Sequence, residues 1–573
     1  MGEARHTVFP RLRGSFPTLR SYNSDVMKAT ALCLLLLSPA VLAQSSHPMS
    51  MNSSPAPGER LGTVSFSVSC SPAAQASFNR GVALLHDFWY SEAGPQFERI
   101  AKADPGCAMA HWGIAMSKFH QIWDRPDETT MKAGWEEMQK AQSPAAKTAR
   151  ERAYIAALAA FYKPGKEDFM ARVTAYSDAM GAIYKQYPDD VDAGAFYALS
   201  LLASGAPDDT SLTQNRKAMA VLTPLFAKYP DNPGVVHYII HSCDNPDMAH
   251  DGLAAANHYG EIAQSGPHAV HMSGHIYARL GMWPQDIGAQ LASIKASEMA
   301  EARGESGIMD EPHSYDFLMY AYLQSGQDAS AKEVVEKMPA VLERIRNMSG
   351  MHDMAYMIPY YRSEFPVMYA LEMRDWQTAS ALKPVPGAQP AFETQTWWAR
   401  AVADGHLRRA EQAQADLAKH DALMEEVKKG DHAFFADSTG AKIERHEIAG
   451  WAAFASGRND EALKEMRAAA DLQDKVGQGE VDIPAREMLA DMLLELHQPQ
   501  QALAEYRVAL KLSPRRFNGL YNAGAAAEAA GDKRAAAEYY AALLKSTGNG
   551  AQSSRPEMAH AKSFVESEQV AAR

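Results

Sequence analysis

A repeat with a period of 34 residues near the C-terminus constrains the fold of this chain more than any other feature of its sequence. Small, aromatic and aliphatic residues recur at that spacing, followed in the first copy by a proline: Ala502, Tyr506, Ala509 and Pro514, then Ala536, Tyr540 and Leu543. The small residues let two helices pack closely, and a proline ends the second helix. The period therefore predicts stacked helix pairs rather than one globular core.

Other parts of the chain fit the same template of small, aromatic or aliphatic, and proline residues. Three such sets are Gly81, Ala93, Phe97 and Pro105; Ala218, Leu222, Leu225 and Pro230; and Gly450, Ala462, Met466 and Ala469. The chain thus resembles tetratricopeptide-repeat (TPR) proteins over most of its length. The resemblance implies an all-α fold, a right-handed α-solenoid of TPR-like helix pairs, and we expect it to form two repeat blocks.

Composition changes along the chain indicate where these blocks begin and end. The proline-rich run Lys383-Pro-Val-Pro-Gly-Ala-Gln-Pro390 is the best internal boundary. We therefore expect an N-terminal extension and signal peptide at 1–43, a disordered leader at 44–70, a TPR-like block with a His-rich groove at 71–382, a Pro-rich linker at 383–395, a C-terminal TPR block at 396–545 and a polar tail at 546–573.

The N-terminus contains a signal for export. Met27-Lys28 is a short positive segment, an apolar core runs from Ala29 to Leu37, and cleavage is expected after Ala43. Met27 is an alternative start of the protein, and an uncleaved anchor is the alternative to a cleaved signal. The sequence predicts a periplasmic or secreted protein with no transmembrane segment after cleavage, because no later apolar segment is long enough.

The charge of the chain bears on its partners. The formal net charge is −13, and the acidic residues are spread along the mature region. A protein of this charge is not expected to bind nucleic acid or anionic lipid.

Export also makes the cysteines informative. An oxidising compartment favours a disulfide between Cys70 and Cys107, which flank the first predicted helix pair. Antiparallel helices bring these two ends within reach of a bridge. Cys243 is left over, with a buried, a reactive and a metal-ligating role all open.

Five histidines and an aspartate lie within one 39-residue stretch: His237, His241, Asp244, His268, His271 and His275. The pairs His237/His241 and His271/His275 have i,i+4 spacing, so each pair shares one face of a helix. In the repeat register, these residues lie on first helices, whose side chains line the concave groove. The next first helix adds His313, Asp316 and Tyr320 to the same groove.

Three interpretations of this cluster remain open. The first is a polar peptide-binding groove or a set of satisfied buried histidines. The second is a metal site for zinc or copper, in which Asp244 or Asp316 is a ligand or orients a ligating imidazole. The third is metal-free acid–base catalysis by a His–Asp or His–Tyr pair. The motifs HExxH, GxSxG and GxxxxGK[ST] are absent from the sequence, which disfavours an ordinary metalloprotease, hydrolase or NTPase.

Four segments are similar to a group of exported bacterial TPR proteins with His-rich repeat helices. They are FNRGVALLHDFWYSEAGPQFERIAKADPGCAMAHWGIAMS, YPDDVDAGAFYALSLL, HYIIHSCDNP and PHAVHMSGHIYARLG. Where relatives tend to read HMPSHI, this chain has His271-Met-Ser-Gly-His275-Ile, which keeps both histidines. The resemblance implies an α-solenoid outside the cytoplasm, and it implies no particular reaction.

The sequence as a whole predicts an exported TPR scaffold that binds a peptide or protein partner in its concave groove. The alternative is a metal-binding protein or metal-dependent enzyme that uses the histidine cluster, and a third hypothesis is a purely structural role in envelope assembly. Whether the protein is an enzyme stays open at this point.

Overall fold

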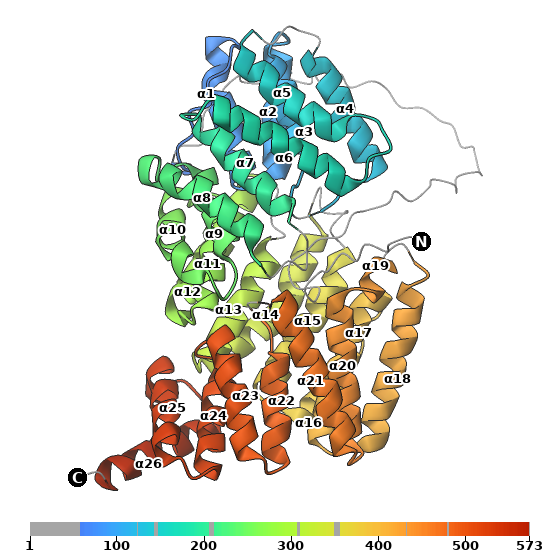
Figure 1. Ribbon diagram of the computed structural model, residues 1–573, viewed down its shortest axis with the longest axis vertical. Coiled ribbons are helices and arrows are strands. Elements are labelled where there is room, and N and C mark those ends of the chain that lie inside the picture. The colour runs from blue at the N-terminus through green and yellow to red at the C-terminus, as the bar shows by residue number, and fades with distance from the viewer. Residues whose placement is uncertain are drawn as a thin grey trace, which may run out of the picture.

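The computed structural model describes residues 58–571, apart from 123, 143–146, 206–210, 306–309, 349–355, 431–432, 478 and 480. Within these residues every regular element is a helix (Figure 1). The expected signal peptide, its cleavage site at Ala43 and the leader up to residue 57 lie outside the described residues. No helix in the described part of the chain is long and apolar enough to span a bilayer.

Consecutive helices pack as antiparallel pairs that stack on their neighbours along the chain. The first part of the stack contains η1 (Pro72–Ala74), α1 (Gln75–His86), α2 (Tyr90–Ala103), α3 (Ala108–Met116), α4 (Glu128–Gln142), α5 (Ala149–Tyr162), α6 (Phe169–Gln186), α7 (Val191–Ala203), α8 (Thr213–Lys228), α9 (Pro233–Cys243), α10 (Ala249–Ile262), α11 (Pro267–Arg279), α12 (Trp283–Ala302), α13 (Asp310–Gln324) and α14 (Asp328–Arg346).

The second part continues the stack in the lower half of Figure 1. It contains α15 (Ile358–Glu372), α16 (Trp376–Ser380), α17 (Pro390–His406), α18 (Ala410–Val427), α19 (Ala433–Ala436), α20 (Thr439–Ala455), α21 (Asn459–Val476), α22 (Ala485–Glu495), α23 (Pro499–Leu512), α24 (Phe517–Ala529), α25 (Lys533–Ser546), η3 (Gly548–Gly550) and α26 (Pro556–Ala571). The predicted all-α solenoid of TPR-like helix pairs is therefore confirmed.

Local sequence signals set the helix ends that matter for the histidine cluster. Helix α9 begins with Pro233 at its first position, and the side chain of Asn232 accepts a hydrogen bond from the backbone N–H of Val235 at 3.1 Å. Helix α11 also begins with a proline, Pro267. After α11 the chain turns through Gly281 in the left-handed region, with φ of 62°. That conformation ends the helix and returns the chain as α12.

The predicted disulfide between Cys70 and Cys107 is present, with its two Cα atoms 4.8 Å apart. The segment before it, residues 58–70, was expected to belong to a disordered leader, but it packs on the repeats. Leu61 and Phe66 are buried, and the backbone N–H of Gly62 donates to the carbonyl of Ile262 at 2.9 Å. Apolar side chains in an extended segment cover the first helices, so the folded part starts earlier than expected.

The expected boundary at 383–395 does not separate two hydrophobic cores. One continuous cluster of buried side chains runs from Ala278 to Ala561. Across the boundary, the rings of Tyr360 and Phe392 lie 5.6 Å apart between α15 and α17. Pro390 starts α17 instead of belonging to a linker, because proline fits the first turn of a helix.

The expected polar tail at 546–573 also takes part in the fold. Helix α26 follows α25, and its residue Ala561 is fully buried. Just before α26, Arg555 donates from Nε to Oδ1 of Asp328 at 3.0 Å, which ties this end to the start of α14. Buried contacts, rather than a marked amphipathic pattern, hold this segment on the repeats.

The solenoid curls so that α24 packs against α13 (Figure 1). The indole Nε1 of Trp283 donates to the carbonyl of Arg515 at 3.0 Å. Next to it, the buried Arg516 forms ion pairs with Glu372 and Glu487 at 2.8 and 2.9 Å. We call Arg516, Glu372 and Glu487 the arginine clasp. It joins first helices that are far apart in sequence.

Candidate metal centre

Three neighbouring first helices carry the histidine cluster. Helix α11 packs against both α9 and α13. The structure therefore brings together the histidines of the three helices, as the repeat register predicts. They form two groups of three, and within each group one nitrogen from each imidazole lies within 4.8 Å of the other two.

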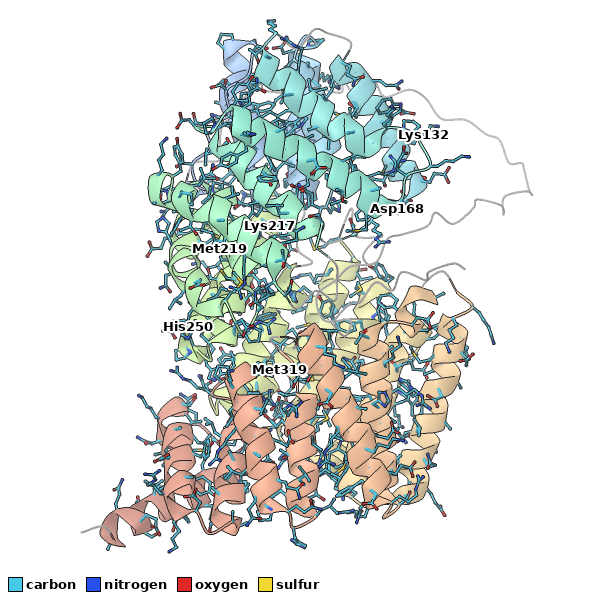
Figure 2. All side chains as sticks on the ribbon, in the orientation of Figure 1. Lys132, Asp168, Lys217, Met219, His250 and Met319 are labelled. Carbon is cyan, nitrogen blue, oxygen red and sulfur yellow. A yellow bond between two sulfur atoms is a disulfide. The ribbon has the colours of Figure 1, made fainter. Side chains whose placement is uncertain are left out.

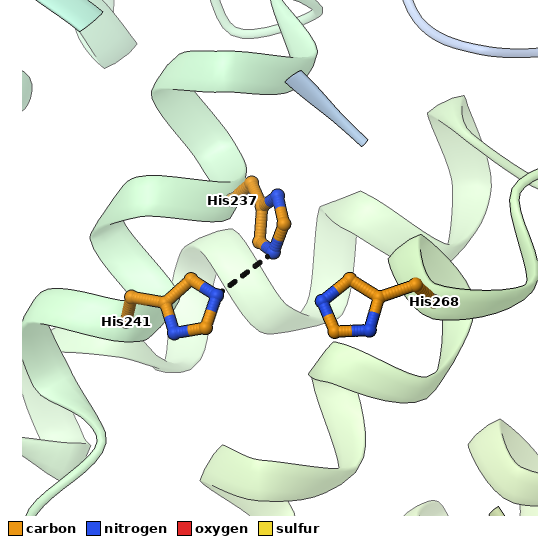
Figure 3. A group of neighbouring side chains, drawn as sticks. All are labelled: His237, His241 and His268. Atoms are coloured by element: carbon orange, nitrogen blue, oxygen red, sulfur yellow. Dashed lines mark hydrogen bonds between the residues drawn. The ribbon is translucent and has the colours of Figure 1, made fainter. Parts of the chain in front are cut away.

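The first histidine triad consists of His237 and His241 on α9 and His268 on α11. Figure 3 shows the imidazoles of His237 and His241 one helical turn apart, with the imidazole of His268 opposite them. The Nε2 atoms of His237 and His241 are 3.0 Å apart. The ring centroids of His237 and His268 lie 5.2 Å apart. Two helices thus direct three imidazoles to one place.

The second histidine triad repeats this arrangement with His271 and His275 on α11 and His313 on α13. The Nε2 atoms of His271 and His275 are 3.0 Å apart. The ring of His313 lies 4.4 Å from that of His271, centroid to centroid. Each triad therefore combines an i,i+4 pair from one helix with a single histidine from the next first helix.

Hydrogen bonds at the outer nitrogens fix the protons of three of these imidazoles. Nδ1 of His237 donates to the carbonyl of His86 at 2.6 Å, and Nδ1 of His275 donates to Oδ2 of Asp244 at 2.9 Å. Nδ1 of His271 donates to Oε1 of Gln290 at 2.7 Å. In the neutral form, all three imidazoles then present an Nε2 lone pair to the interior of their triad.

The orientation of the Gln290 amide follows from a second hydrogen bond. Its Nε2 donates to Oδ1 of Asp286 at 2.8 Å, so Oε1 is the atom that faces His271. This contact needs Gly274, because a Cβ there would lie 2.0 Å from Nε2 of Gln290. The missing side chain at Gly274 lets α12 come close enough to orient a histidine of α11.

Burial determines the charge of the imidazoles. It lowers the pKa of His237, His241 and His271 well below the usual range, and repulsion from neighbouring imidazoles adds to the effect. Burial also lowers the pKa of His268 and His313 to about 3. All five are neutral at pH 7, which is the form that binds metal ions and the wrong form for a general acid.

Aromatic rings cover both triads. Phe88, in the turn between α1 and α2, lies with its ring centroid 4.3 Å from that of His237. Phe317, on α13, lies 4.8 Å from both His271 and His275. These rings exclude water and lower the local dielectric, which strengthens any interaction of the imidazoles with a cation.

The acidic residues predicted as ligands occupy different places. Asp244 lies behind the second triad, where its Oδ1 accepts from Nε of Arg279 at 3.0 Å while Oδ2 orients His275. It therefore orients an imidazole and is not one of the grouped ligand atoms. Asp316 is buried further along α13. Burial raises the pKa of Tyr361, and the nearby charge of Asp316 raises it further. Neither carboxylate belongs to a triad.

Tyr320 does not line an open groove, in contrast to the expectation from the repeat register. It is 2% exposed, its hydroxyl donates to the carbonyl of Asp482 at 3.0 Å, and it contacts Arg516. The C-terminal repeats fill this part of the inner face, because the solenoid curls back on itself. A peptide has no access to Tyr320 in this conformation.

Cys243 follows the first triad but takes no part in it. Its thiol is buried against Met219, with the two sulfur atoms 3.5 Å apart. Burial raises the pKa of the Cys243 thiol to about 12. Among the three roles left open by the sequence, the structure places it as a buried core side chain.

Several contributors to the site were missed at the sequence level. His313 was assigned to a groove rather than to a triad, and the backbone of His86 and the side chain of Gln290 were not considered. Asp310 was missed as well: its Oδ1 lies 3.3 Å from Nδ1 of His268, and burial raises the pKa of Asp310 to about 7. No spacing rule identifies such contacts, since they join different helices.

Comparison with known proteins finds distant similarity to solved structures only. No family model matches the sequence, and no curated protein matches it. Among solved structures, the human IFIT1 dimer with PPP-AAAA is 12% identical over 76% of this chain and 90% of that chain, with a TM-score of 0.35. The yeast Tom70 structure is 12% identical over 87% and 96%, with a TM-score of 0.32. The TPR domain of P58(IPK) is 15% identical over 66% and 99%, with a TM-score of 0.21.

These similarities are too distant to support an argument about this chain. Its own helix pairs, their stacking and the left-handed turns between them define the class: an α-helical repeat protein of the tetratricopeptide type. Its first helices α9, α11 and α13 carry the two histidine triads.

Proposed function

We propose that this protein binds transition-metal ions, zinc or copper, through its two histidine triads. The observation that carries the proposal is the pair His271 and His275, whose Nε2 atoms lie 3.0 Å apart while both Nδ1 atoms donate outward. Two lone pairs then face each other across a hydrogen-bond distance. A cation between them turns this repulsion into attraction.

The donor set supports a metal rather than a proton as that cation. Imidazole nitrogens suit zinc and copper, and three of them complete the protein part of a tetrahedral site. Metal-binding histidines usually donate their other N–H to a carboxylate, a backbone carbonyl or water. Asp244 and the carbonyl of His86 are acceptors of the first two kinds, and the side-chain carbonyl of Gln290 takes the same role for His271. The helical repeat acts as the rigid support that holds the triads.

The test is the metal content of protein purified without a chelator or an affinity tag. We expect stoichiometric metal in the wild type and its loss in the His271→Ala/His275→Ala variant. The matched control is His250→Ala, since His250, labelled in Figure 2, is exposed on α10 and belongs to neither triad. Metal-free wild-type protein whose melting temperature does not change on adding Zn²⁺ or Cu²⁺ would overturn the proposal.

We also propose that the protein binds a peptide or protein partner, at a place other than the groove that the sequence predicts. A hollow between α15, α17 and α22 is lined by Arg374, His406 and Asp491, among other residues. The hollow is small, about 20 Å³, and Arg374 and Asp491 already form an ion pair in it, so it could take only the end of one side chain of such a partner. The test is titration with a library of short peptides. Binding that survives Arg374→Glu would rule out this hollow.

Export to the periplasm or beyond the cell is also proposed. The Cys70–Cys107 disulfide supports it, because disulfides persist mainly in oxidising compartments. The measurement is the N-terminal mass of the protein in a periplasmic or culture fraction of a bacterial host. A mature chain that begins at Gln44 is expected, and an intact N-terminus in the cytoplasmic fraction contradicts it.

A further inference from the structure

The two histidine triads are neighbours rather than separate sites. His268 belongs to the first triad and His271 to the second, and they are one turn apart on α11, with ring centroids 6.2 Å apart. Three residues rise about 4.5 Å along a helix, so His268 and His271 place one ligand of each triad side by side on α11. Ions bound to both triads would therefore lie next to each other.

The charges around the triads favour monovalent ions. All six ligand atoms are imidazole nitrogens, and the carboxylates of Asp244 and Asp310 lie behind His275 and His268. Two divalent ions would place four positive charges opposite two outer carboxylates in a largely buried site. Two Cu(I) ions would place only two, and this smaller charge is easier to accommodate because Arg279 already pairs with Asp244 and burial raises the pKa of Asp310 to about 7. Neutral imidazole is also a good donor to copper.

Burial is uneven across the six imidazoles, and this defines how a ligand would enter. His237 and His271 are fully buried, whereas His241, His275 and His313 are partly exposed. Each triad therefore has at least one partly exposed imidazole. Phe88 and Phe317 pack against the imidazoles and make the surroundings apolar. Such a site admits a small uncharged molecule more readily than a hydrated ion or a bulky substrate.

We propose that the two triads hold a pair of copper ions that binds dioxygen between them. This rests on the proposed metal-binding function. Each Cu(I) gives up one electron, the dioxygen accepts both and becomes a bridging peroxide, and two Cu(II) ions result. The O–O bond remains, no proton is needed, and the reverse step releases dioxygen and restores both Cu(I) ions.

The test uses the full chain loaded with Cu(I) under anaerobic conditions. We expect about two copper ions per chain and, after dioxygen is admitted, an intense near-ultraviolet charge-transfer band that is lost when dioxygen is removed. The oxidised sample should give no electron paramagnetic resonance signal, because the two Cu(II) spins couple through the bridge. His250→Ala is expected to behave like the wild type.

His313→Ala removes one ligand of the second triad only. This variant should retain about one copper ion, lose the charge-transfer band and show the resonance signal of an isolated Cu(II) ion on oxidation. His241→Ala should do the same from the first triad, and circular dichroism checks that both variants are folded. Two copper ions that give the full signal of isolated Cu(II) overturn the pair but leave metal binding intact. Absence of bound copper and zinc overturns both proposals.

Discussion

The histidine triads and the arginine clasp are both buried polar clusters, and they differ in how their charges are balanced. In the clasp, Arg516 donates from Nε to Glu487 at 2.9 Å and from an Nη atom to Glu372 at 2.8 Å. A cation and two anions thus lie together inside the fold. In the second triad, by contrast, His271 and His275 direct two acceptor nitrogens at each other.

The difference separates structural from functional polar groups. In the arginine clasp, the charges of the chain balance one another without any bound ion, and the ion pairs hold distant repeats together. In the triads, neutral imidazoles direct lone pairs at one another, and an acceptor holds Nδ1 of His237, His271 and His275, so a cation would complete the arrangement. This supports the proposal that the triads take up a cation from outside the chain.

The largest effect is expected from breaking the clasp. Arg516→Met leaves Glu372 and Glu487 buried without their cation, which should lower the free energy of unfolding by about 3–5 kcal/mol in urea titrations. Removing all three charges, as in Arg516→Met/Glu372→Leu/Glu487→Leu, should restore much of the loss. Metal content should not change in either variant. A loss below about 1 kcal/mol in the single variant would show that the clasp does not stabilise the fold.

Acidification should act on the triads. The pKa of His268 and His313 is about 3 in the folded chain and about 6.5 when unfolded, so the unfolded chain takes up protons first. Stability of the metal-free protein is then lost as the pH falls from about 6.5 towards 3. At pH 5.5 these two histidines alone cost about 3 kcal/mol. Urea titrations at pH 7 and 5.5 measure the loss, and His268→Gln/His313→Gln should reduce it.

Removing an orienting contact should weaken metal binding without abolishing it. Asp244→Asn, which alters the acceptor behind His275, is expected to raise the metal Kd by about 10- to 100-fold in competition titrations with a chelator. Asp231→Asn is the matched control, because Asp231 forms a similar contact of 2.8 Å with His258 outside the triads. Equal Kd values for the two variants would contradict the role of Asp244.

The smallest effect concerns a histidine of the second part of the solenoid. Burial alone would lower the pKa of His420 on α18, but Asp421 and Glu444 raise it to about 9. Its stabilising contribution is complete below about pH 6.5 and is lost as the pH rises through 9. Between pH 7 and 8.5, we expect a loss of about 1 kcal/mol, allowing for solvent screening of Asp421. In the His420→Gln variant this dependence on alkaline pH should disappear.

Much of the local structure could be predicted from the sequence. The period of small and aromatic residues gave the helix pairs, and the flanking positions of Cys70 and Cys107 gave the disulfide. The i,i+4 spacing of His237/His241 correctly indicated a shared helix face. These features depend on neighbours within one or two helices, where 3.6 residues per turn fixes the geometry.

The extent of the folded region was harder to predict. Residues 58–70 and 556–571 carry weak patterns of their own, and they are ordered by apolar contacts with distant repeats, such as those of Phe66 and Ala561. The break expected near Pro390 was based on composition alone. It did not account for packing between Tyr360 and Phe392 across that segment.

The sequence by itself determined the helical repeat, the faces of its helices and the set of histidines on them. Only the tertiary structure decided which histidines meet: His268 turns to α9, and His313 joins His271 and His275. It also covered Tyr320 with Arg516, 196 residues away, and placed the carbonyl of His86 behind His237, 151 residues away. The reason is that small rotations between successive helix pairs add up along a solenoid, and spacing within one helix does not specify their sum.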